Sequence, residues 1–384
     1  MSTTTPSKQA YYIFSNGILQ RKDNTIRFVP TINQEESTVE TDPDAWFSDA
    51  SDESFDLSAE SYPEGDNAKR KVVPINSIDA FYVFGETSFN TKFFNFLAKE
   101  KIPLHLFNYY GYYSGTFYPR DYLISGYVIV QQVKHYTAAK KRIELAREFI
   151  SAAALNILKN LKYYIADSRK QSLKPENIEP LQKIIEKISD YADTLIAAGD
   201  IPTLMGLEGN IRQMYYEAWP LLLKTQSEFF AFEKRVRNPP DNAINALISF
   251  GNSLMYSACL TEIYRTQLHP AISFLHEPSE RRFSLALDLA EIFKPIFVDR
   301  IIFKLINTQA LQAKHFAQAM NFCHLNNAGQ KIFVSEFEDK LRTTIKHRSL
   351  DRQVSFRRLI RLECYRLIKH LLGEKNYEGF KIWW

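Results

Sequence analysis

Two carboxylates three residues apart stand in an otherwise apolar helical pattern around residue 290. Asp288 and Glu291 fall on the face that the apolar residues of 282–296 form at helical spacing. His276 precedes them in a proline-containing turn, so a reversal of the chain could bring its imidazole over both acids. A buried carboxylate needs a cation. That cation is either a metal ion or one of the two arginines just before the helix, and this stretch alone favours an arginine.

A third acid, Glu208, lies between Gly206 and Gly209 at the edge of an apolar helical face in 203–219. Glycine inside a helix costs about 1 kcal/mol relative to alanine. Two glycines around one acid therefore indicate the close approach of a ligand or of another backbone. The alternative is tight helix packing, with Glu208 paired to an arginine.

A polar line marks the apolar helical run after residue 242. Asn245, Ser249 and Asn252 follow one another at helical spacing, and Arg235 and Arg237 precede the run. These residues either make hydrogen bonds between helices or support a catalytic centre and contact phosphate.

Two carboxylates and a histidine from separate segments could bind one divalent metal ion. Oxygen and nitrogen ligands without cysteine suit Mg²⁺ or Mn²⁺ better than structural zinc. In a basic protein such a metal indicates phosphodiester chemistry, because it polarises a phosphate and lowers the pKa of an attacking water or hydroxyl.

The charge of the chain is unevenly distributed. The net charge is +4, but residues 31–68 contain twelve acids and no lysine or arginine, so the rest of the chain carries about +16. Residues 341–370 hold nine lysines and arginines against two acids, more than solubility requires. The balance favours a polyanionic partner such as nucleic acid, with phosphate binding near the C-terminus.

The elements that must position these residues divide the chain into two parts, an α+β arrangement. Residues 1–116 predict a small β-rich domain with a hairpin at 11–30 and a mostly disordered acidic insert at 31–68. After a linker at 117–124, residues 125–384 predict a larger all-helical domain that carries every candidate site residue. Long helical runs are expected at 123–165, 175–198, 203–230, 241–266, 282–308 and 336–371.

The three cysteines are far apart and form no CxxC pair, which indicates a reducing, cytoplasmic environment. We expect neither a signal peptide nor a membrane span, because the N-terminus has no long apolar segment and no run of 18 apolar residues follows.

The segments LMGLEGNIRQMYY, NPPDNAINALISFGNSLMY and FLHEPSERRFSLALDLAEIFKP occur in this order. Together with the N-terminal β region, they resemble the CRISPR-associated integrase family, the universal spacer-acquisition protein of CRISPR systems. The resemblance spans nearly the whole chain except the insert 31–68. Four residues depart from the family's usual motifs: Asn242-Ala243 and His269 stand where Asp-Pro and Asp are common, and Lys294 stands where arginine is common.

The resemblance implies a metal-dependent DNA integrase, in which the 3′-hydroxyl of a captured DNA fragment attacks a phosphodiester of the CRISPR repeat. Its metal ligands carry over onto Glu208, His276 and Glu291, with Asp288 as a neighbouring catalytic acid and Mg²⁺ or Mn²⁺ as the cofactor. It implies homodimers that flank a small companion adaptation protein on double-stranded DNA. Candidate DNA contacts are Arg235, Arg237, Asn245, Ser249, Arg282, Lys294, Arg357 and Arg358.

Two other functions use the same residues. The first is a metal-dependent DNA endonuclease that hydrolyses without joining. The second is a non-catalytic DNA-binding scaffold, in which Glu208 and Glu291 are structural ion pairs.

Overall fold

The computed structural model describes residues 8–31, 71–166, 173–224, 227–237, 239–278, 283–319, 322–347 and 350–383. The predicted disordered insert lies, apart from Thr31, outside these residues.

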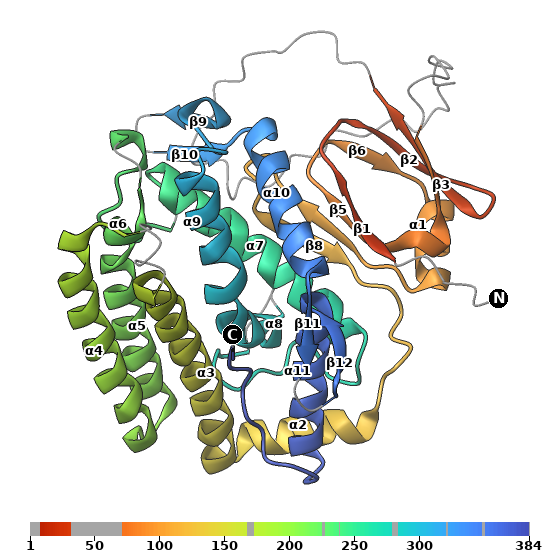
Figure 1. The fold of residues 1–384 in the computed structure, drawn as a ribbon. Helices are drawn as coiled ribbons and strands as arrows, with labels where there is room; N and C mark the ends of the chain where they lie inside the picture. The colour runs from red at the N-terminus through yellow and green to blue at the C-terminus, as the bar shows by residue number, and fades with distance from the viewer. Residues whose placement is uncertain are drawn as a thin grey trace, which may run out of the picture.

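The N-terminal region forms two four-stranded sheets beside one helix (Figure 1). The first sheet has the order β1-β5-β7-β8 and the second the order β4-β3-β2-β6. The elements are β1 Gln9–Ile13, β2 Gly17–Lys22, β3 Thr25–Pro30, β4 Lys71–Pro74, β5 Ile78–Val83, β6 Thr87–Phe89, α1 Thr91–Glu100, β7 Leu104–Phe107 and β8 Tyr113–Phe117. Apolar residues of both sheets and α1, among them Ile78, Phe81 and Phe93, form a core of their own.

The predicted hairpin at 11–30 is partly correct. Strands β2 and β3 pair in antiparallel register from Gly17–Pro30 to Lys22–Thr25, and Asp23 occupies the turn with a φ of 53°. Strand β1 instead pairs in parallel with β5 in the other sheet. Gly17 lies where the chain changes sheets, and a Cβ there would lie 2.4 Å from the Val29 carbonyl oxygen.

The rest of the chain is mostly helical, which confirms the α+β prediction. The helices are α2 Gly126–Thr137, α3 Ala139–Ala166, α4 Ile178–Thr194, α5 Ile201–Glu217, α6 Trp219–Leu222, α7 Ala243–Tyr264, α8 Ser284–Phe293, α9 Arg300–Asn307, α10 Asn327–Arg342 and α11 Phe356–Leu371. The expectation of an all-helical domain was wrong at two places. Hairpins join β9 Phe316–Ala319 to β10 Phe322–Leu325 and β11 Thr344–His347 to β12 Arg352–Ser355.

Helices α8 and α9 form one nearly continuous run through a π-helical turn, η7, at Pro295–Asp299. Pro295 has no amide hydrogen to donate, and the Asp299 amide donates to the Lys294 carbonyl at 3.1 Å. The turn places Asp299 inside the core, where its side chain is 3 % exposed.

Helix α7 forms the centre of the helical region and packs against α8 and α11. By length and composition alone it could span a membrane, but most of its residues are buried inside the protein, as in the core helix of a soluble domain. One face of the first N-terminal sheet, including Tyr82 and Phe107, joins this helical core. The apolar core thus continues across the predicted linker.

Candidate active site

Glu208 lies in the middle of α5. Asp200 caps this helix by accepting a hydrogen bond from the Thr203 amide at 2.7 Å. No described atom lies within 4 Å of a Cβ built on Gly206 or Gly209, so the expected close backbone contact is absent from the described residues. The two glycines instead keep the surface on either side of Glu208 free of side chains. Glu208 itself is partly accessible, with 21 % of its side chain exposed.

Asp288, on α8, stabilises the turn that carries His276. Its carboxylate is fully buried, and one oxygen accepts hydrogen bonds from the amides of Phe274 at 2.7 Å and Leu275 at 3.0 Å. The other oxygen accepts from the His276 amide at 3.0 Å and from the His276 ring at 2.8 Å. Asp288 therefore fixes both the backbone and the ring of His276, and no carboxylate oxygen is left toward the solvent.

This arrangement sets the chemistry of His276. A carboxylate only accepts, so Nδ1 carries a proton, and the described residues supply no hydrogen-bond partner for Nε2. Burial lowers the pKa of His276, but the hydrogen bond to Asp288 and the charges of Asp288 and Glu291 outweigh burial and raise it. When the ring is neutral, the Nε2 lone pair is available to a metal, and a carboxylate behind Nδ1 is the usual support of such a ligand.

Glu291 faces two cations. Arg212 Nη2 lies 2.5 Å from Glu291 Oε2, and Lys294 Nζ lies 2.5 Å from Oε1. Burial acts to raise the pKa of Glu291, but the charges of Lys294 and Arg212 outweigh burial and hold it well below its usual range. Glu291 is therefore ionised at neutral pH although its side chain is only 10 % exposed.

Arg212 links the two acidic segments. Besides its bond to Glu291 on α8, its Nε atom lies 3.3 Å from Glu208 Oε1 on its own helix α5. An arginine does neutralise these acids, as one of the sequence alternatives held; it is Arg212, and the two arginines before α8 lie outside the described residues. Sequence reasoning missed Arg212, although its position four residues after Glu208 predicts a contact on the same helix face.

The donor types suit a divalent ion. Glu208 and Glu291 contact different nitrogens of the same guanidinium, so carboxylates from α5 and α8 both face Arg212, and the charge of Glu291 acts on His276. As the described residues stand, no group of three His, Cys, Asp or Glu side chains is close enough to hold a metal. Arg212 takes the central position instead.

The polar line on α7 serves Arg235. The Arg235 guanidinium donates to Asn245 Oδ1 at 3.1 Å and to Ser249 Oγ at 2.8 Å. Asn245 is fully buried and also donates to Asp241 at 2.7 Å. These contacts correspond to the alternative of internal hydrogen bonding, and they tie the segment before α7 to the helix that packs on α8.

The remaining candidate DNA contacts are in different situations. Arg357 stays a prediction, but it is already paired, because its guanidinium lies 2.6 Å from both Asp79 on β5 and Glu338 on α10. It joins the N-terminal sheet to the helical region. Lys294 is paired with Glu291, Arg282 lies outside the described residues, and Arg237 and Arg358 stay predictions.

Comparison with known proteins gives matches over nearly the whole chain. The family model described as "CRISPR associated protein Cas1" matches residues 56–339. A CRISPR-associated endonuclease Cas1 from Fusobacterium nucleatum is 44 % identical over 377 residues, covering 98 % of this chain and 97 % of the relative. A solved CAS1 protein from Thermotoga maritima is 36 % identical with a TM-score of 0.76, covering 97 % of this chain and all of that one.

Two more distant structures share the fold. A casposase bound to an integration product is 19 % identical with a TM-score of 0.74, covering 96 % of this chain and 92 % of that one. A Cas6-RT-Cas1–Cas2 complex is 17 % identical with a TM-score of 0.73, covering all of this chain and 36 % of that one. The matching family model and the identity to full-length relatives place this chain in the Cas1 family of CRISPR-associated proteins.

Proposed function

We propose that this protein is a metal-dependent DNA integrase of CRISPR adaptation, which joins the 3′-hydroxyl of a DNA fragment to the CRISPR repeat by transesterification. The observation that carries the proposal is the convergence of two carboxylates from α5 and α8 on one cation, beside a histidine whose ring a buried aspartate holds. An arginine alone would satisfy the two acids. It would not require the hydrogen bonds by which Asp288 holds the His276 ring and the backbone amides of Phe274, Leu275 and His276.

The residues divide the work. Glu208, Glu291 and His276 Nε2 would hold Mg²⁺ or Mn²⁺, and Asp288 positions the histidine without reaching the solvent itself. The bound metal would polarise the phosphate and stabilise charge on the leaving oxygen. Lys294, which pairs with Glu291, would add positive charge beside the site for a phosphate.

The proposed partners are double-stranded DNA, a second copy of the chain and a small companion adaptation protein, in the cytoplasm. The charge of about +16 outside the acidic insert supports a DNA partner, with Arg237 and Arg358 as candidate backbone contacts. The related Cas6-RT-Cas1–Cas2 complex supports the companion protein, because its Cas1 part has the fold of this chain.

A strand-transfer assay tests the function. The protein, its companion, Mn²⁺ and labelled DNA with a free 3′-hydroxyl are incubated with a plasmid that carries the repeat. We expect label to become joined to the repeat, and Glu208→Ala, His276→Ala and Glu291→Ala to abolish joining while DNA affinity survives. If each folded variant still joins DNA, the assignment of the site is wrong.

The main alternative is hydrolysis without joining, which the description of the Fusobacterium nucleatum relative as an endonuclease favours. It would use the same residues with water as the nucleophile. Cleaved plasmid without any joined label, in the presence of the companion protein, would assign this activity instead.

A further inference from the structure

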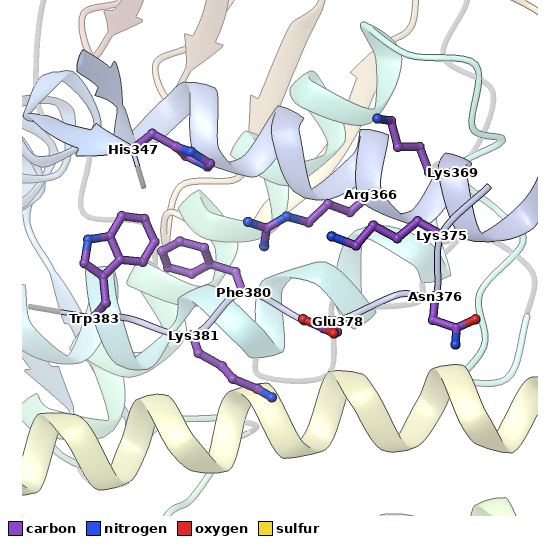
Figure 2. A pocket seen from close by; sticks show the side chains of 10 residues that line it. His347, Arg366, Lys369, Lys375, Asn376, Glu378, Phe380, Lys381 and Trp383 are labelled. Atoms are coloured by element: carbon purple, nitrogen blue, oxygen red, sulfur yellow. The ribbon is translucent and has the colours of Figure 1, made fainter. Parts of the chain in front are cut away.

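A cationic cavity lies between α11 and the C-terminal tail that follows it (Figure 2). Its volume is about 380 Å³, at the small end of the range for ligand pockets. Its lining includes none of Glu208, His276 or Glu291.

Positive charge dominates the lining. Arg366 and Lys369 come from α11, and Lys375 and Lys381 come from the tail, against one lining acid, Glu378. Figure 2 shows the charged ends of Arg366 and Lys375 pointing in the same direction, toward the rings at the other end of the cavity. Cations gathered around one space repel one another, so the arrangement gains stability when an anion enters.

Most of this charge is not neutralised within the protein. Arg366 pairs with Glu363 at 3.0 Å, but Lys369, Lys375 and Lys381 are exposed and have no ion-pair partner among the described residues. The α11 dipole accounts for cations in its last turns, such as Arg366 and Lys369. It does not account for Lys375 and Lys381, which lie beyond the end of the helix.

The tail is held firmly in the position that forms the cavity. Buried Glu363 accepts hydrogen bonds from the Tyr377 hydroxyl at 2.7 Å and the Phe380 amide at 2.9 Å. Asn156 of α3 donates to the Phe380 carbonyl at 2.9 Å and accepts from the Ile382 amide at 2.8 Å. The cavity is therefore part of the packed structure and does not depend on a loose end of the chain.

Aromatic rings line the side opposite the cations. Phe380 and Trp383 lie with their ring centroids 5.5 Å apart, and Trp383 is partly exposed. Cations that bind phosphate beside an aromatic surface that can stack on a base are the combination that recognises nucleotides.

We propose that this cavity binds one nucleotide unit, with its phosphate on Arg366, Lys369, Lys375 and Lys381 and its base against Trp383. The nucleotide is either free or part of a single strand. The proposal does not depend on the integrase function, since the two sites share no residue.

Isothermal titration of the full chain with deoxyadenosine monophosphate tests the site. We expect saturable binding at one site per chain, weakened at least about tenfold, or about 1.4 kcal/mol, in the variant Lys369→Gln/Lys375→Gln/Lys381→Gln. The matched control Lys92→Gln/Lys162→Gln/Lys187→Gln removes the same charge from three exposed lysines outside the cavity and should keep the wild-type affinity. All six lysines are exposed, so both variants should unfold at the wild-type temperature.

Two further titrations define the ligand. Trp383→Leu should weaken deoxyadenosine monophosphate and leave pyrophosphate unchanged. Displacement of the mononucleotide by an eight-nucleotide oligo(dT) would assign the site to a strand, and failure to displace it would assign the site to a free nucleotide. The proposal is overturned if the mononucleotide does not bind wild type at millimolar concentration, or if the control variant loses as much affinity as the cavity variant.

Discussion

Replacing Arg212 by glutamine removes the cation that Glu208 and Glu291 share. The guanidinium is 12 % exposed and contacts one oxygen of each acid, so the substitution leaves Glu291 with Lys294 alone and Glu208 without an ion pair among the described residues. The change is confined to the centre of the proposed metal site.

The loss of stability in Arg212→Gln follows from the burial of these ion pairs. Removing one partner of a buried ion pair costs about 3–5 kcal/mol, because the other charge stays out of water. Lys294 still pairs with Glu291, and Glu208 is 21 % exposed and can be hydrated. Each carboxylate therefore destabilises the variant less than a fully buried, unpaired charge would. We expect Arg212→Gln to lower the free energy of unfolding by about 2–4 kcal/mol in EDTA.

Mn²⁺ should reverse this loss. An ion that binds only the folded protein stabilises it by about 2.7 kcal/mol at a concentration of 100 times its Kd. The metal takes the place of the missing arginine, so the variant should gain more from Mn²⁺ than the wild type, in which Arg212 competes. Urea unfolding followed by circular dichroism, with EDTA or with Mn²⁺, measures both quantities.

Arg357→Gln is the matched control. Arg357 also joins two buried carboxylates, Asp79 and Glu338, at 2.6 Å each, but neither acid contacts a histidine among the described residues. It should lose similar stability and gain nothing from Mn²⁺ beyond the wild-type gain. Equal Mn²⁺ gains in both variants would refute the idea that Arg212 occupies a metal site.

Three other substitutions test separate parts of the structure. Asp288→Asn leaves two of the four hydrogen bonds to the carboxylate without an acceptor, so the urea midpoint should fall by the equivalent of about 2–5 kcal/mol. The pKa of His276, measured by NMR, should fall too, because burial is then opposed mainly by the charge of Glu291. Burial raises the pKa of Asp299 to about 7, so the folded state holds a proton that the unfolded state loses, and wild-type stability falls as pH rises from about 4 to 7. Asp299→Asn should remove this decline and be more stable by up to about 4 kcal/mol at pH 8; equal pH slopes would contradict it. Gly379→Ala places a Cβ 2.6 Å from Ala152 Cβ, so it should cost about 1–3 kcal/mol and abolish nucleotide binding in the cavity, as urea unfolding and titration would show.

The sequence predicted the fold class well because the spacing of apolar residues is strong in long helices such as α7. It failed where pairing depends on distant partners. Nothing local shows that β1 leaves β2 and pairs with β5, or that the basic run 341–370 bends into the hairpin β11–β12 between two helices. These choices are made by tertiary contacts, which periodicity does not record.

The candidate site was predictable in its residues but not in its contacts. The spacing of Asp288 and Glu291 placed both on one helix face, yet only the fold shows that Asp288 turns inward to the 274–276 backbone while Glu291 turns to Arg212. Charge counting likewise marked Arg357 as a phosphate contact, because a sequence does not show that an arginine is already paired. The glycines beside Glu208 are explained by open surface rather than by packing.

The proposed function requires Glu208, His276 and Glu291 to form one divalent-cation site. Titration of Mn²⁺ followed by electron paramagnetic resonance counts bound ions directly and needs neither DNA nor a partner. We expect one bound Mn²⁺ per wild-type chain, lost in Glu208→Ala, His276→Ala and Glu291→Ala and kept in Glu336→Ala, whose acid pairs with Lys304 elsewhere. Unchanged Mn²⁺ binding in the three folded site variants would contradict the account.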